Sequence, residues 1–438
     1  MTTPHIDTES DEQTLLRILS PRARGCPYPL YEKARRAEPV WVEGRPVVVF
    51  GSYEACRSVL RDPRASNERR HALLYAAGGG APGEADVAGG PEGAVAPVAE
   101  IPSFLFMDPP RHTELRRLVS HAFSPRAVLR LEPMIKELID DLLDEAAAQG
   151  TLEAIDDFAS PLPVTVICRV LGIDTGERNW YRTRSSLLGE SVDPYPAFAG
   201  TQTPGLTERV RAERELTAFF TRLVADRRAA PREDLVSALV RAQDEGGLDE
   251  AEVVTTCRLL LNAGHETTVN LVGNGLLALT RAPDQLDLIR RDPGAADAAV
   301  EEILGLDPPL QLVHRHARTD MDVLGTHVPR GTTMVLLLAA ANRDEAAVAD
   351  AGRLDAGRAT PRDHLSFGLG PHFCLGAPLG RLEARLAFTR FAQRVVAPRL
   401  TAGPLRYRRN VVLRGLDALP LDTDGIRDRS VPWETPRP

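Results

Sequence analysis

The sequence predicts a mainly α-helical fold with small β-sheets, and three observations support that prediction. Beyond residue 111, apolar side chains recur every three or four positions, which is the period of an amphipathic helix. Residues 252–283 (EVVTTCRLLLNAGHETTVNLVGNGLLALTRAP) are apolar on nearly every side, which predicts a buried central helix. Strand character is confined to short stretches that do not alternate with helices, so a Rossmann-type sheet is not expected.

Local signals predict the individual elements in chain order. Residues 39–50 (PVWVEGRPVVVF) hold two β-branched runs separated by the tripeptide EGR, which predicts a hairpin. A short helix is expected over residues 52–63, with Ser52 as its N-cap. Further helices are expected over residues 131–150, 207–230 and 377–395, and further strand character over residues 326–340 and 410–421.

Composition and charge narrow the class of protein. The 438 residues are 43% hydrophobic and 26% charged, as in ordinary globular proteins, and their number alone suggests two or three domains. A net charge of −8 argues against nucleic acid as a main partner. The N-terminal segment lacks a signal-peptide core and no apolar run reaches membrane-span length, so no membrane association is expected. The five cysteines are dispersed and include no CxxC pair, so we expect a reduced, cytoplasmic protein.

Two stretches interrupt the helical pattern. Residues 76–100 are rich in Gly, Ala and Pro and lack apolar periodicity, which predicts a flexible loop. Such a loop serves either as a passive linker or as a functional lid. Residues 192–205 form a second break, rich in Pro and Gly.

One cysteine, Cys374, stands in the glycine-rich stretch FGLGPHFCLG (367–376), just before the helix expected at 377–395. The dipole and the unpaired N–H groups of a helix start are expected to lower the pKa of this thiol. The residues alone leave several uses open. Cys374 could bind zinc together with His364 and His372, or act as a nucleophile with His372 as its base. It could also be the axial ligand of a haem, or an inert core thiol.

The stretch FGLGPHFCLG closely resembles the haem-ligand loop of the cytochrome P-450 superfamily in its soluble bacterial form. The resemblance implies that Cys374 is the proximal ligand of the haem iron, that Phe367 packs beside the thiolate and that His372 bonds a haem propionate. Gly368 and Gly376 would let the backbone pass beneath the macrocycle. The implied cofactor is haem b (heme b, iron protoporphyrin IX), buried between the long central helix and the cysteine loop.

Within the long helix, the segment AGHETT resembles the oxygen-activating segment of the same family. Ala263 and Thr267 lie four positions apart on one helix face, and the small Ala263 and Gly264 leave room over a ligand. Glu266 and Thr267 offer a carboxylate and a hydroxyl that could hand protons to bound O₂. The alternative is a helix-internal hydrogen bond from Thr267, with Glu266 merely solvated.

Two further segments resemble family parts that bind the haem propionates. In MDPPRHTELRRLVSHAFSP, His112 and Arg116 lie four positions apart and could reach one anionic group, unless they form a solvated basic face. In QLVHRHA, the resemblance implies a propionate contact for Arg315. The residues implied to line the substrate side are Gln311, Leu312 and Val313.

One position departs from the family pattern. Glu302 matches the glutamate of the Glu-x-x-Arg motif, but Gly305 stands where the arginine belongs. Glu302 is therefore expected to pair with Arg358 directly or to bind water, because an unpaired buried carboxylate is costly. On this interpretation, Gly305→Arg would raise thermal stability or haem retention.

The resemblance runs from about residue 28 to residue 421 and implies one haem-thiolate domain over residues 1–438, expected as a monomer. It implies a monooxygenase that hydroxylates or epoxidises a bulky, apolar small molecule with O₂, as in secondary metabolism. Electrons would come from a ferredoxin and a ferredoxin reductase. Basic residues that could face this partner, or simply be solvated, are Arg116, Arg117, Arg381 and Arg385. The alternatives are peroxide-driven or non-oxygenating haem chemistry, or a haem- or ligand-binding protein without turnover.

Overall fold

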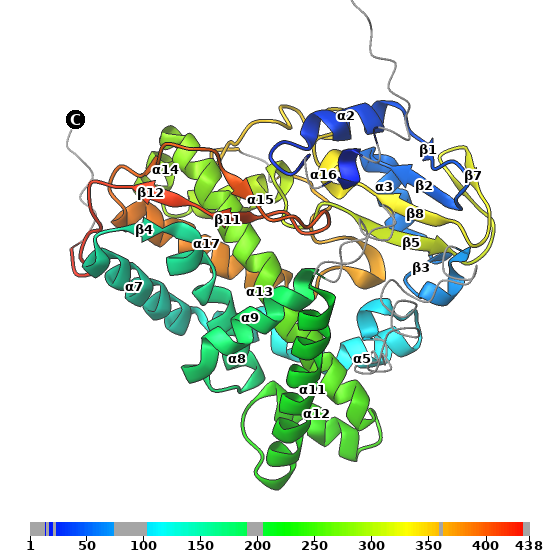
Figure 1. The fold of residues 1–438 in the computed structure, drawn as a ribbon, viewed down its shortest axis with the longest axis horizontal. Coiled ribbons are helices and arrows are strands. Elements are labelled where there is room, and N and C mark those ends of the chain that lie inside the picture. The colour runs from blue at the N-terminus through cyan, green and yellow to red at the C-terminus, as the bar shows by residue number, and fades with distance from the viewer. Residues whose placement is uncertain are drawn as a thin grey trace, which may run out of the picture.

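The computed structural model describes residues 14, 17–20, 23–73, 103–190, 205–358 and 362–431. In Figure 1, a large helical part crossed by the long helix α13 (Glu250–Arg281) stands beside a smaller part that contains the largest sheet. The mainly α-helical fold with small sheets is therefore confirmed. The loop predicted at 76–100 lies outside the described residues, as does the break predicted at 192–205 apart from its last residue.

The largest sheet has five short strands in the order β1-β2-β8-β5-β3. β2 runs parallel to β8, and the other neighbouring strands are antiparallel. Its strands are β1 (Val40–Trp41), β2 (Val47–Phe50), β3 (Ala65–Ser66), β5 (Val313–Ala317) and β8 (Thr333–Leu336). The smaller sheets contain β4 (Leu152–Glu153), β12 (Pro420–Asp422) and β9 (Arg399–Leu400); β6 (Met321–Val323) and β7 (Thr326–Val328); and β10 (Arg406–Tyr407) and β11 (Leu416–Ala418).

The helices predicted from periodicity are confirmed, and their ends follow capping chemistry. The Ser52 side chain accepts a hydrogen bond from the backbone N–H of Ala55 at the start of α3. Helix α13 begins two residues earlier than predicted because Asp249 and Glu252 form a capping box. The other helices are α2 (Tyr28–Arg36), α3 (Tyr53–Arg61), α5 (Arg111–Ser120), α6 (Pro125–Leu129), α7 (Glu132–Gln149), α8 (Pro161–Leu171), α9 (Arg178–Gly189), α11 (Leu206–Ala229), α12 (Leu235–Asp244), α14 (Pro283–Arg291), α15 (Ala295–Leu306), α16 (Leu338–Ala341) and α17 (Ala377–Arg394).

Strands occur in the stretches where they are predicted, but they are shorter than predicted. The hairpin predicted at 39–50 is β1 and β2, paired in antiparallel register. The stretch 326–340 divides into β7, β8 and the start of α16, because the apolar run after β8 turns into a short buried helix. Apolar runs of this length do not distinguish a buried strand from a buried helix.

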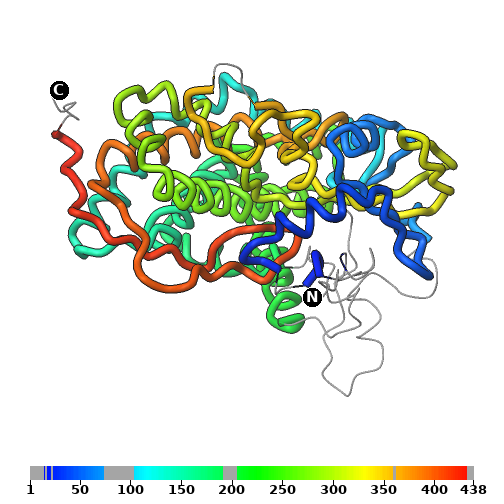
Figure 2. Tube along the Cα trace, turned by 90° about the horizontal axis from the view of Figure 1, so that it is seen from above, coloured from blue at the N-terminus to red at the C-terminus, as the bar shows by residue number. Residues whose placement is uncertain are grey.

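Helix α13 lies at the centre of the helical part. Figure 2 shows it between α17 on one side and the C-terminal strands on the other. A side chain at Gly275 would lie 2.5 Å from Cε1 of Phe388 in α17, so the missing side chain lets these helices approach closely. On the opposite side, Gly415 packs in the same way against Asn270. Among the described residues, no helix has both the length and the apolar content needed to span a membrane.

Candidate functional site

The cysteine stretch 367–376 folds into a tight loop at the start of α17. The backbone N–H of Cys374 donates a hydrogen bond to the carbonyl of Phe367, 2.8 Å away, which closes the loop. Gly370 has φ +70°, and a Cβ there would lie 2.6 Å from the backbone carbonyl oxygen of Leu60 in α3. Glycine at this position therefore allows both the left-handed backbone and the close packing of the loop on the sheet part.

The environment of the Cys374 thiol combines burial with positive charge. Burial raises the pKa of the thiol, while backbone N–H groups of Gly376 and Ala377 and the nearby charges of Arg116 and Arg381 act to lower it. The expected net lowering by the helix start is therefore wrong, since desolvation outweighs it in the protein alone. No hydrogen bond joins this thiol to a histidine within the described residues, so the nucleophile alternative lacks its base.

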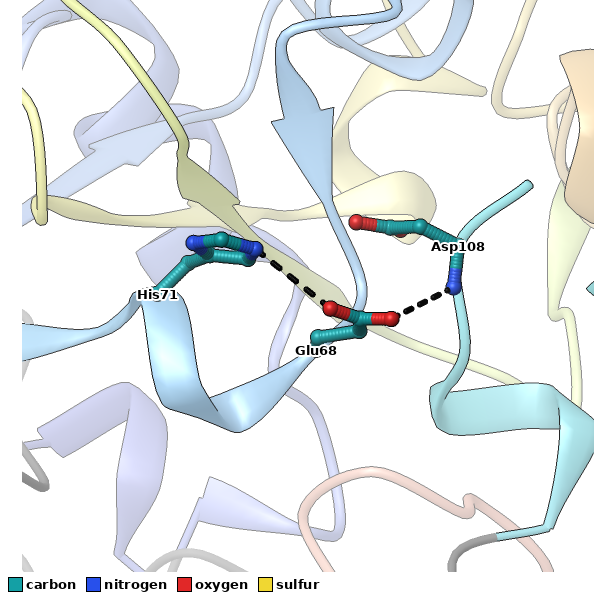
Figure 3. Close-up of side chains that lie close together, drawn as sticks. All are labelled: Glu68, His71 and Asp108. Atoms are coloured by element: carbon teal, nitrogen blue, oxygen red, sulfur yellow. Dashed lines mark hydrogen bonds and ion pairs between the residues drawn. The ribbon is translucent and has the colours of Figure 1, made fainter. Parts of the chain in front are cut away.

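The zinc alternative also loses its support. In the part of the chain that the structure describes, the one group of three residues with metal-ligand atoms close together is Glu68, His71 and Asp108. Figure 3 shows the Glu68 carboxylate between the His71 ring and the backbone N–H of Asp108. Glu68 also accepts from Arg70, and Asp108 accepts from Ser66. These bonds already satisfy the carboxylates and fix the residues before α5 against the end of β3.

Four basic side chains from three segments form a cluster: His112 and Arg116 of α5, Arg315 of β5 and His372 of the cysteine loop. Burial lowers the pKa of His372 to about 3, with contributions from the neighbouring charges of His112, Arg315 and Arg116. Burial likewise lowers the pKa of Arg315 to about 10. The His112 and His372 rings stack with centroids 4.1 Å apart. Arg116 donates to the carbonyl of Phe373 at 2.5 Å, next to the cysteine.

This cluster lacks anionic partners within the described residues. Both ring nitrogens of the buried His112 are without hydrogen-bond partners. Arg315 is 8% exposed, and its described hydrogen bond goes to the neighbouring carbonyl of His314. Buried cations and imidazoles without acceptors are costly, so the arrangement suits a dianionic ligand.

One face of α13 is uncovered by protein. Ala263 is exposed although the rest of this helix is mostly buried, and Gly264 and Thr267 are partly exposed. The Thr267 hydroxyl donates to the carbonyl of Ala263 at 2.6 Å. The missing side chain of Gly264 serves packing as well, because its Cβ would lie 3.0 Å from Ile167 of α8. Its expected role of leaving room over a ligand is therefore only part of the explanation.

Comparisons with known proteins decide the family. A cytochrome P450 family model matches residues 99–292 and 295–398, well over half of the chain. The chain belongs to the cytochrome P450 superfamily. It is 37% identical over 406 residues to the cytochrome P450 monooxygenase PikC of Streptomyces venezuelae, covering 90% of each protein. It is 41% identical over 323 residues to 6-deoxyerythronolide B hydroxylase of Saccharopolyspora erythraea, covering 73% of this chain and 77% of that protein.

The fold comparison agrees with the sequence comparison. The ligand-free crystal structure of CYP164A2 from Mycobacterium smegmatis superimposes with a TM-score of 0.83 at 41% identity, covering 94% of this chain and 99% of that chain. This P450 is accordingly a haem b monooxygenase, as the resemblance implied. When bound, the haem supplies the iron that activates O₂.

The residues of this P450 fit that cofactor. The unpartnered nitrogens of His112 and the buried guanidinium of Arg315 would hold the two propionates, with His372 and Arg116 beside them. Cys374 would supply the thiolate ligand to the iron. The uncovered face of α13 around Ala263 would leave room for the bound group.

The residues predicted to line the substrate side lie in different surroundings. The Gln311 side chain is buried, accepts from the Tyr31 hydroxyl at 3.0 Å and donates to the carbonyl of Pro308 at 2.6 Å. Leu312 is buried with Tyr31 in the cluster beneath α2. Val313 is partly exposed and packs on the other cluster of the sheet part. The contacts of Gln311 and Leu312 are those of core residues, whereas Val313 retains an accessible side.

The Glu266 carboxylate is held by two partners from distant segments. It accepts a hydrogen bond from the Ser186 hydroxyl of α9 and pairs with Arg408, which follows β10. Its side chain is 6% exposed, so the alternative of a merely solvated carboxylate is wrong. The other part of that alternative, the helix-internal hydrogen bond from Thr267, is present. Its neighbour His265 is buried as well, and burial lowers the pKa of that imidazole to about 4.

The pairing expected for Glu302 is confirmed. Arg358 donates to the Glu302 carboxylate at 2.6 Å, and Glu302 is 1% exposed. Two contacts escaped the sequence analysis. The Arg362 guanidinium lies 3.6 Å from Glu302 on the other side. In addition, Glu301 binds Arg381, whose guanidinium lies 4.5 Å from the centroid of the Phe367 ring.

Proposed function

We propose that this P450 hydroxylates or epoxidises a bulky, largely apolar organic molecule in secondary metabolism. The observation that carries the proposal is the uncovered face of α13, where Ala263 and Thr267 present little bulk and one hydroxyl to a bound molecule. Relatives named for hydroxylation of 6-deoxyerythronolide B and of vitamin D(3) support a large substrate.

Thr267 and Glu266 deliver protons to the reacting oxygen in this proposal. The Thr267 hydroxyl lies on the uncovered face, while Glu266 holds its carboxylate against Ser186 and Arg408 behind it. Glu266 therefore acts as a relay behind Thr267, with the Ser186 hydroxyl of α9 as its neighbour in the hydrogen-bond chain.

A ferredoxin and its reductase supply the electrons in this proposal, and the protein acts as a monomer. Three of the four basic residues expected to face the ferredoxin already have partners, since Arg116 binds the Phe373 carbonyl, Arg381 binds Glu301 and Arg385 binds Glu132. Arg117 of α5, Arg126 of α6 and Arg130 at the end of α6 are also exposed. These three arginines would offer positive charge to an acidic ferredoxin.

Thr267→Val is expected to lower product formation by about 10²-fold, because a positioned proton donor contributes roughly 10²–10⁴-fold to such a step. The enzyme is reconstituted with a bacterial ferredoxin and reductase, and macrolactones and sterols are screened by the Soret shift on binding. Product and hydrogen peroxide per NADPH are then measured. Peroxide should rise as product falls, because reduced oxygen that is not protonated productively is released.

Thr268→Val is the matched control, since this neighbouring threonine is buried on another face of α13. It should retain product formation. Equal loss in both variants would contradict the role of Thr267. Turnover by wild type with added peroxide, but not with reductase and ferredoxin, would instead establish peroxide-driven chemistry.

A further inference from the structure

The side chain of Arg362 fills the space beside Gly305. A Cβ on Gly305 would lie 2.9 Å from Cζ of Arg362 and still closer to Nε and Cδ. The Arg362 side chain is completely buried, so it has no open space into which to move. The volume that a side chain at position 305 would need is therefore already occupied by an arginine from the loop after Arg358.

Arg362 binds the C-terminal end of α15 and two neighbouring segments. Its Nη2 donates to the carbonyl oxygens of Ala351 at 2.6 Å, Asn342 at 2.8 Å and Gly305 at 3.4 Å. The last carbonyls of a helix have no partners within the helix, and cations are favoured at this end of the dipole. Arg362 thus closes the helix end and ties it to the residues after α16.

The same network continues to the cysteine loop. The Asn342 side chain accepts from the backbone N–H of Leu365 at 2.7 Å and donates to the Ser366 hydroxyl at 2.8 Å. The Ser366 hydroxyl donates to the carbonyl of Leu304 in α15 at 2.6 Å. The next residue, Phe367, accepts the hydrogen bond from the N–H of Cys374. Arg362 therefore braces the start of the loop that presents the thiol.

A second arginine also lies beside the Glu302 carboxylate. Glu302 is almost fully buried and lies between Arg358 at 2.6 Å and Arg362 at 3.6 Å. Burial lowers the pKa of Arg362, and the Glu302 carboxylate acts in the opposite direction. Removal of one partner from a buried ion pair is strongly destabilising, because it leaves an uncompensated buried charge.

We propose that Arg362 is a positioning residue that replaces the arginine missing at position 305. Its guanidinium reaches Glu302 from the loop before the cysteine. The absence of a side chain at Gly305 leaves the space that the Arg362 side chain occupies. Gly305 and Arg362 therefore form a matched pair. Contrary to the expectation from the sequence, Gly305→Arg alone disrupts the brace, because two guanidinium groups then compete for one buried space.

The test moves the arginine from position 362 to position 305, in the 438-residue protein with haem bound. Gly305→Arg and Arg362→Met are each expected to accelerate haem transfer to apomyoglobin at least about tenfold, since both break a buried ion-pair network. Both should also reduce the fraction of ferrous CO complex that shows the thiolate Soret band. Arg362→Lys, which keeps the charge, should lie between wild type and Arg362→Met. The double variant Gly305→Arg with Arg362→Gly should return to within about threefold of wild type.

Gly352→Arg is the control, because a Cβ there meets nothing within 4 Å and an added arginine extends into open space. It should behave as wild type. Either of two results would overturn the proposal: Gly305→Arg alone holding haem at least as well as wild type, or the double variant losing haem as fast as the worse single variant.

Discussion

Replacement of Arg315 by Met is expected to accelerate haem loss by about 10- to 100-fold. The Arg315 guanidinium is buried, and among the described residues no carboxylate forms an ion pair with it. Charge-assisted hydrogen bonds contribute roughly 1.5–3 kcal/mol, and about 1.4 kcal/mol corresponds to a tenfold change. The rate of haem transfer to apomyoglobin, followed by the Soret band, measures the effect.

Arg318→Met is the control for loss of a nearby arginine. Arg318 follows β5 three positions after Arg315, but its side chain is 43% exposed and lies 3.8 Å from Asp108. Its removal should leave haem retention almost unchanged, since exposed ion pairs contribute little. Arg315→Lys should be intermediate because it keeps the charge and loses the planar geometry. Equal haem retention by Arg315→Met and wild type would show that the propionates are held elsewhere.

The features predicted correctly from the sequence are those set by local chemistry. The length and burial of α13 follow from its uniformly apolar pattern, and the Ser52 cap follows from one hydroxyl at one position. The cysteine loop is predictable for the same reason, because the glycines and the cysteine that define it are contiguous. The pairing of Glu302 with Arg358 is also predictable, since the family pattern includes both partners.

The features missed depend on side chains that meet across long separations. Nothing in the composition around Arg362 indicates that its guanidinium is buried against Gly305, 57 positions earlier. Glu266 has the same difficulty, because its partner Arg408 lies 142 positions later. Gly305 was itself a usable signal, since a glycine within a helix often marks a close approach by another group. The sequence pattern predicts the loss of a brace at this position, whereas in the structure the Arg362 guanidinium lies 3.6 Å from the Glu302 carboxylate.

Glu301→Gln is expected to lower the free energy of unfolding at pH 7 by about 3 kcal/mol. Burial acts to raise the pKa of this carboxyl, but hydrogen bonds from Arg381 and His364 outweigh it and lower the pKa to about 2. A depressed carboxyl pKa stabilises the fold above the ordinary value of 4.5. A shift of this size corresponds to roughly 3 kcal/mol, at about 1.4 kcal/mol for each pH unit.

The pH dependence distinguishes this ionic contribution from a loss of packing. Thermal unfolding of wild type and Glu301→Gln should differ most above pH 4.5, and the difference should shrink as the pH falls toward 2. Asp297→Asn is the control on the same helix, because its ion pair with Arg385 is long and its side chain is 73% exposed. If the difference in thermal stability between wild type and Glu301→Gln stayed constant with pH, the effect would come from packing and not from the charge. Because Arg381 also covers the Phe367 ring, loss of Glu301 should weaken the thiolate Soret band of the CO complex at neutral pH as well.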